Sequence, residues 1–267
     1  MTDGARIRLQ PMLIAEIHGK RFPEAEGQED LLTSAVFGHL RHIAPGLFWP
    51  DLLDRAHMAS ERISLGSRIR AAGVQLWHYP KLEIRFWEQC GRYGEPDLIL
   101  HFSGGAQPSL IVVIEVKLDS GKSGSGGDDQ LKRYLQFLND SSALRDFPAP
   151  PSLRFLVYLT RAFSKLEIEE SVRISVQAGI KDAGARIFGL QWQDVLESAE
   201  ANADSHELLD EVARFLKIRE FEAFRGFRSP PAGLNLPSGA FYGRTYFARE
   251  NPAFQLDPSQ GGKFYGV

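Results

Sequence analysis

The chain contains very little cysteine, because Cys90 is the single thiol among its 267 residues. No disulfide can form within the chain, which excludes the small disulfide-stabilised secreted scaffolds and is typical of a reducing compartment. A strong charge of either sign is absent too: 31 Lys and Arg face 34 Asp and Glu, for a net charge of −3. This balance argues against a protein that coats nucleic acid through overall basicity, but it leaves room for a local basic cleft.

Long hydrophobic runs are also absent. The most apolar stretch, Leu110–Val116, is too short to cross a bilayer. Residues 1–10 lack the apolar segment of a secretory signal. With 43% hydrophobic and 24% charged residues, the composition is that of an ordinary globular protein. We therefore expect a cytoplasmic protein with no membrane partner.

The apolar patterning predicts an alternation of helices and strands. We expect helices near 28–44, 51–72, 129–138, 165–180 and 205–224, and strands near 74–88, 97–102, 110–118, 153–160 and 186–190. Such an alternation is typical of an α/β fold, with a central mixed sheet flanked by helices. Residues 1–27 read as an N-terminal arm, 28–200 as the main domain, and 201–267 as a C-terminal helix and irregular tail packed on the core. The glycine-rich segment 119–128 and the proline-rich segment 146–152 are expected loops.

The second and third expected strands form a hairpin whose register can be predicted. If the hairpin folds symmetrically about Ala106, then Phe102 pairs with Leu110 and Asp97 lies opposite Glu115. Directly opposed residues point to the same face of a sheet, with Cβ atoms about 4.5–5.5 Å apart. The register therefore predicts two carboxylates that face each other at one end of the hairpin.

Such a pair of carboxylates has a chemical use. Asp97 and Glu115 would repel each other, and a divalent cation between them removes the repulsion. Mg²⁺ commonly takes one or two protein carboxylates and keeps several waters. Lys117 lies two residues after Glu115 on the same strand face, where its ammonium can orient a water or stabilise negative charge in a transition state.

Two neighbouring helices supply further candidates. The helix expected from residue 129 begins with Gln130 and carries Tyr134 four positions later, so both share one helical face. Glu29 lies on the apolar face of the first helix, one turn before Leu32. An acid at a helix start is also explained by the helix dipole alone, and Glu26 is an alternative candidate for the same place.

These residues resemble the PD-(D/E)XK nuclease superfamily, whose fold is called restriction-endonuclease-like. The resemblance rests on Pro96-Asp97, on Glu115-Val116-Lys117, and on Gln130 and Tyr134, which are similar to the Q-x-x-x-Y helix of the RecB-like branch. It implies that the Asp97 and Glu115 carboxylates and the Val116 carbonyl bind the metal. It also implies that Lys117 assists the attacking water, that Gln130 orients the lysine or the substrate, and that Glu29 adds a carboxylate.

The resemblance implies a Mg²⁺-dependent nuclease, with Mn²⁺ as a substitute, that hydrolyses phosphodiester bonds of nucleic acid. It favours DNA as the substrate and a role in phage defence, restriction or repair, and homodimers are common in the family. The main alternative is a catalytically inactive member of the fold that serves as a binding or scaffold module in a larger complex. Another is an exposed Glu115–Lys117 pair at a strand end with Asp97 in a turn, and a third is an unrelated phosphate-handling α/β enzyme.

Overall fold

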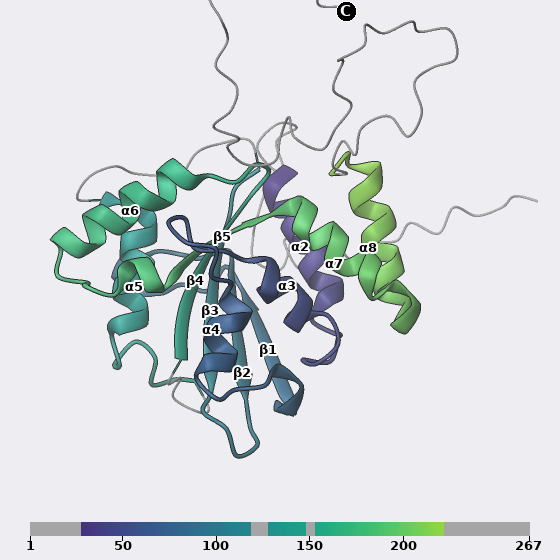
Figure 1. Ribbon diagram of the computed structural model, residues 1–267, viewed down its shortest axis with the longest axis horizontal. Coiled ribbons are helices and arrows are strands. Elements are labelled where there is room, and N and C mark those ends of the chain that lie inside the picture. Colours follow the sequence, from purple (N-terminus) through teal and green to yellow (C-terminus); the bar gives the residue numbers. More distant parts are fainter. Residues whose placement is uncertain (1–27, 119–127, 148–152, 222–267) are drawn as a thin grey trace, which may run out of the picture. The chain divides into compact units, whose positions relative to one another are not determined.

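The computed structural model describes residues 28–118, 128–147 and 153–221 (Figure 1). Its strands are β1 (Lys81–Phe86), β2 (Leu98–Ser103), β3 (Leu110–Val116), β4 (Leu153–Thr160) and β5 (Ile187–Gln191). Its helices are α2 (Gln28–Leu40), α3 (Trp49–Arg55), α4 (Leu65–Ala71), α5 (Gln130–Asn139), α6 (Lys165–Gln177), α7 (Trp192–Ala201) and α8 (Glu207–Ile218). The predicted N-terminal arm, the glycine-rich segment 119–127, residues 148–152 and the tail from 222 lie outside the described residues.

The strands form one five-stranded sheet in the order β1-β2-β3-β4-β5. The pairs β1–β2 and β2–β3 are antiparallel, whereas β3–β4 and β4–β5 are parallel. A parallel pair needs a crossover, and α5 and α6 provide the two that this sheet requires. The predicted α/β fold with a mixed sheet flanked by helices is confirmed.

The central strand β3 shows how the sequence places the site. All seven of its residues are buried, which suits a run rich in Val and Ile that is covered on both faces. Val112 and Ile114 belong to one hydrophobic cluster, and Ile111 and Val113 belong to the other. Since successive side chains alternate between faces, Glu115 follows Ile111 and Val113 onto the second face.

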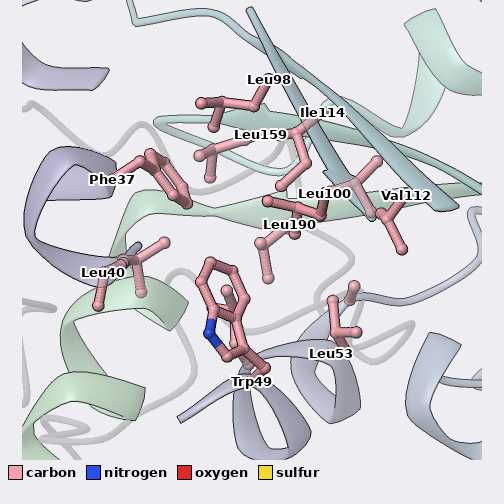
Figure 2. Packing of buried hydrophobic residues seen from close by; sticks show 14 of the residues in the cluster. Phe37, Leu40, Trp49, Leu53, Leu98, Leu100, Val112, Ile114, Leu159 and Leu190 are labelled. Atoms are coloured by element: carbon pink, nitrogen blue, oxygen red, sulfur yellow. The ribbon is translucent and has the colours of Figure 1, made fainter. Parts of the chain in front are cut away.

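The first face of the sheet is covered by α2, α3, α4, α7 and α8. Figure 2 shows Phe37 and Leu40 of α2 and Trp49 of α3 packed against leucines of the strands. The Trp49 indole is fully buried and lies edge-on to Phe102, with ring centroids 6.2 Å apart. This packing anchors α2, the helix that carries Glu29, to the sheet.

The second face is covered by α5 and α6, which Figure 1 shows side by side. Asp129 caps α5: its Oδ1 accepts a hydrogen bond from the Lys132 backbone N–H at 2.9 Å. Its Oδ2 accepts one from the Ser171 hydroxyl of α6 at 3.0 Å. One buried carboxylate therefore fixes where α5 begins and ties that end to α6.

Two sequence-based predictions about local structure were wrong, and one helix was missed. The helix expected over 51–72 is two helices, α3 and α4, because His57 leaves the helix and exchanges two backbone hydrogen bonds with Gly189 of β5. Ser64 then starts α4 by accepting from the Ser67 N–H at 3.1 Å. The strand expected over 74–88 is confined to β1, and α7 was not expected at all. Across the described ranges, no helix has the length and apolarity that crossing a membrane requires.

Candidate active site

The β2–β3 hairpin brings Asp97 and Glu115 together. Its register pairs Phe102 with Leu110 and Leu98 with Ile114, as predicted, so the next pair outward is Asp97 and Glu115. Asp97 Oδ2 accepts a hydrogen bond from the Val116 N–H at 2.8 Å. Asp97 is 8% exposed and Glu115 is 1% exposed. The hairpin therefore holds two carboxyl groups side by side, almost completely buried from solvent.

Lys117 completes this group at the end of β3. Its backbone N–H donates to the Leu159 carbonyl at 2.8 Å, which continues the pairing with β4 for one more residue. Its Nζ lies 2.7 Å from Glu115 Oε1 and donates to the Val116 carbonyl at 2.9 Å. Lys117 is 9% exposed. The alternative of an exposed Glu115–Lys117 pair at a strand end is excluded by this burial.

Glu29 reaches the same place from α2. Its Oε1 lies 3.2 Å from Lys117 Nζ, and its Oε2 accepts from the Leu118 N–H at 2.8 Å. The structure therefore brings Glu29 to the predicted site, although 88 positions separate it from Lys117 in the sequence. Glu26, the alternative candidate, lies outside the described residues.

The electrostatics of the site follow from burial and crowding. Burial raises the pKa of Asp97 well above its ordinary value, and repulsion from Glu115 raises it further. Burial also raises the pKa of Glu115, although the Lys117 ammonium opposes this shift. Burial alone would lower the pKa of Lys117, but the charges of Glu115, Asp97 and Glu29 outweigh it and raise that pKa. Lys117 is therefore held as an ammonium, while the two carboxyl groups would gain from an added cation.

Gln130 and Tyr134 lie together on α5, as their spacing predicted. Gln130 Nε2 donates to the Tyr134 hydroxyl at 3.1 Å, and that hydroxyl donates to the Glu95 carbonyl at 3.1 Å. Burial raises the pKa of Tyr134, and the charge of Glu115 adds to the shift. The Tyr134 hydroxyl therefore stays protonated and ties α5 to the loop that precedes Asp97.

Sequence reasoning missed two residues that border the site. Trp87 directly follows β1, and its Nε1 donates to Asp97 Oδ1 at 3.2 Å. Tyr158 of β4 is the register partner of Glu115, and its hydroxyl donates to Glu167 Oε2 of α6 at 2.9 Å. The register of β1 could have suggested Trp87, because Asp97 lies opposite position 87. Nothing in the sequence gives the parallel register that selects Tyr158.

One feature of the site, a buried carboxylate oxygen, fits the binding of Mg²⁺. Glu115 Oε2 is fully buried and has no hydrogen-bond partner, so an oxygen with free lone pairs is left inside the site. Asp97 and the Val116 carbonyl add further hard oxygen donors beside it, which is the ligand type that Mg²⁺ prefers. Within 28–118, 128–147 and 153–221, no group of three or more His, Cys, Asp or Glu side chains is arranged to hold a metal. The groups at this place that could hold a Mg²⁺ are the two carboxylates of Asp97 and Glu115 and the Val116 carbonyl.

Comparison of the chain with family models, with curated proteins and with solved structures finds no match.

Proposed function

We propose that this protein is a Mg²⁺-dependent nuclease of the PD-(D/E)XK type with a restriction-endonuclease-like core. The observation that carries the proposal is the buried group of Asp97, Glu115 and Lys117 at the end of the β2–β3 hairpin. Two buried carboxyl groups with raised pKa values are costly to keep in a protein that has no use for them. Perturbed groups of this kind gather at functional sites.

The fold supports the same proposal. A helix that carries an acid, an antiparallel hairpin that carries the two carboxylates, and a crossover helix that carries Gln130 and Tyr134 occur in the order that the resemblance implies. All of them meet where β3 ends. DNA as the favoured substrate, a homodimer, and a role in phage defence, restriction or repair rest on the resemblance alone.

Each residue then has a defined task. Asp97, Glu115 and the Val116 carbonyl would hold Mg²⁺, which polarises a phosphoryl oxygen and lowers the pKa of its bound water. Lys117 is kept as an ammonium, so it acts by donating hydrogen bonds to the attacking water or to the phosphate, and by offsetting negative charge in the transition state. Glu29 holds the lysine from the other side, and Gln130 orients the lysine or the substrate.

The test is cleavage of linear, circular and single-stranded DNA and of RNA, with Mg²⁺ or Mn²⁺. Glu115→Gln and Lys117→Met should each lower the rate by about 100-fold or more, as expected when a charged group that stabilises the transition state is removed. Glu83→Gln is the matched control, because Glu83 is a partly exposed carboxylate of the same sheet, paired with Arg85 at 2.8 Å. The control should cleave as the wild type does.

Two results would contradict the nuclease proposal. Cleavage that persists in both site variants would mean that another site or a contaminant is responsible. A wild type that cleaves none of the four substrates, and whose unfolding temperature does not rise with Mg²⁺ or Mn²⁺, would favour the inactive binding or scaffold module.

A further inference from the structure

Trp87 has a backbone conformation that a bulky residue seldom adopts. Its φ is +47°, and among the described residues only Glu220 is another non-glycine with a positive φ. The left-handed region is unfavourable for large side chains, and such strain persists only where the surrounding structure imposes it. Trp87 is also 3% exposed, so the strained residue lies in the packed interior.

The Trp87 ring also packs against residues of the first face. Along β1, Arg85 lies over the Phe147 ring, 4.3 Å from its centroid, and Phe147 belongs to the cluster on the second face. Phe86 belongs to the cluster on the first face. Regular alternation would return residue 87 to the side of Arg85. Trp87 instead joins the cluster of Phe86, and the centroids of these two rings are 5.7 Å apart.

The indole N–H of Trp87 nevertheless reaches Asp97. Position 87 lies opposite Asp97, because the register pairs Phe86 with Leu98. The Trp87 backbone N–H donates to the Asp97 carbonyl at 3.1 Å, and its Nε1 donates to Asp97 Oδ1 at 3.2 Å. The other carboxylate oxygen, Oδ2, accepts from the Val116 N–H at 2.8 Å. Asp97 is therefore held from both sides, with Oδ1 bonded to Trp87 and Oδ2 bonded to Val116.

We propose that Trp87 is the positioning residue of this site: its indole N–H fixes the orientation of the Asp97 carboxylate for the metal. This inference rests on the proposed function, since it takes Asp97 as a metal ligand. Hydrogen bonds that orient metal ligands commonly account for about 10–100-fold in metal affinity or activity. At the end of β1, a buried tryptophan with a positive φ supplies such a bond to Asp97.

The test is direct measurement of Mn²⁺ binding to the full chain by calorimetry. Trp87→Phe removes the donor and should weaken binding by about 10–100-fold. Trp87→His should recover much of this loss, because the imidazole places a ring N–H near the position of the indole Nε1, and histidine tolerates a positive φ better than most residues. The control is Trp49→Phe: Trp49 lies in the same cluster, and its buried Nε1 has no hydrogen-bond partner. That variant should bind Mn²⁺ as the wild type does.

A second measurement, the indole N–H resonance of Trp87, keeps Trp87 in place and so does not depend on whether a variant at position 87 folds. The chain has four tryptophans, so the Trp87 indole N–H resonance can be assigned by elimination with variants of Trp49, Trp77 and Trp192. Mg²⁺ should shift the Trp87 resonance and leave the Trp49 and Trp192 resonances in place. An unmoved Trp87 resonance in a protein that binds Mg²⁺ would overturn the inference.

The outcomes separate the two proposals. Equal Mn²⁺ affinity of the wild type and of folded Trp87→Phe overturns the role of Trp87, even if the protein cleaves DNA. Mn²⁺ binding that depends on Trp87 in a protein that cleaves no nucleic acid supports the role of Trp87 and overturns the nuclease proposal. A wild type that binds no Mn²⁺ overturns both.

Discussion

Removal of the Lys117 charge should destabilise the metal-free protein by an amount that depends on pH. Lys117→Met keeps much of the side-chain length but removes the ammonium that lies 2.7 Å from Glu115 Oε1 and 3.2 Å from Glu29 Oε1. The Glu115 carboxylate would then stay buried beside Asp97 without its counter-charge. Breaking a buried ion pair in this way costs about 3–5 kcal/mol.

The lower end of that range is expected at pH 8, because Glu115 can escape part of the cost by taking up a proton. A loss of about 3 kcal/mol lowers the unfolding temperature by roughly 6–12 °C in a protein of this size. The pKa of Glu115 is already raised by burial, and Lys117 is what opposes that shift. The variant should therefore raise this pKa further. When the pKa of an acid is higher in the folded than in the unfolded protein, the protein loses stability as the pH rises from the unfolded to the folded pKa. The stability deficit of Lys117→Met should therefore shrink toward pH 4–5.

The assay is urea unfolding, followed by circular dichroism, with chelator at pH 8 and at pH 5. The control is Arg70→Met, which breaks a 2.8 Å ion pair to Asp54 whose side chains are 45% and 39% exposed. That exposed pair should contribute less than about 1 kcal/mol at either pH. Addition of Glu115→Gln to Lys117→Met should restore about 1 kcal/mol or more, because the uncompensated charge is gone.

The reasoning would be refuted by a Lys117→Met variant that loses no more stability than Arg70→Met. A deficit equal at pH 8 and pH 5 would also refute it, because the cost would then come from lost packing rather than from a stranded carboxylate. The first result would mean that water reaches the site freely in solution and screens its charges.

Three further predictions concern Gly189, Tyr79 and Gln130. Gly189→Ala should cost about 1–3 kcal/mol in urea unfolding, since its Cβ would lie 2.4 Å from the Phe163 ring; a neutral result would contradict this close packing. Burial raises the pKa of Tyr79 to about 12, so the wild type should lose about 1.3 kcal/mol more than Tyr79→Phe between pH 9 and pH 11, and equal losses would contradict the burial of its hydroxyl. Gln130→Ala should keep its Mg²⁺ affinity in calorimetry but cleave about 10–100-fold more slowly, whereas an equal loss of affinity would assign Gln130 to metal binding.

The sequence determined the local part of the site. The pairing of Asp97 with Glu115 follows from the length of one hairpin, because a short antiparallel connection fixes the register of both strands. The burial of Glu115 follows from the apolar run that precedes it, which is typical of a central strand. The shared face of Gln130 and Tyr134 follows from the period of one helix.

Only the tertiary structure decided the contacts made across long stretches of chain. Glu29 reaches Lys117 because the apolar face of α2 packs on the sheet, and that packing depends on residues of α3, α7 and α8 together. Tyr158 lies beside Glu115 because a parallel register is set by a crossover helix rather than by a turn. The positive φ of Trp87 also depends on the tertiary structure. The strain lies in one residue, but the packing and the Asp97 carboxylate that stabilise it belong to other elements. Hydrophobic patterning predicts which faces of helices and strands are buried, but it does not predict which other element covers each face.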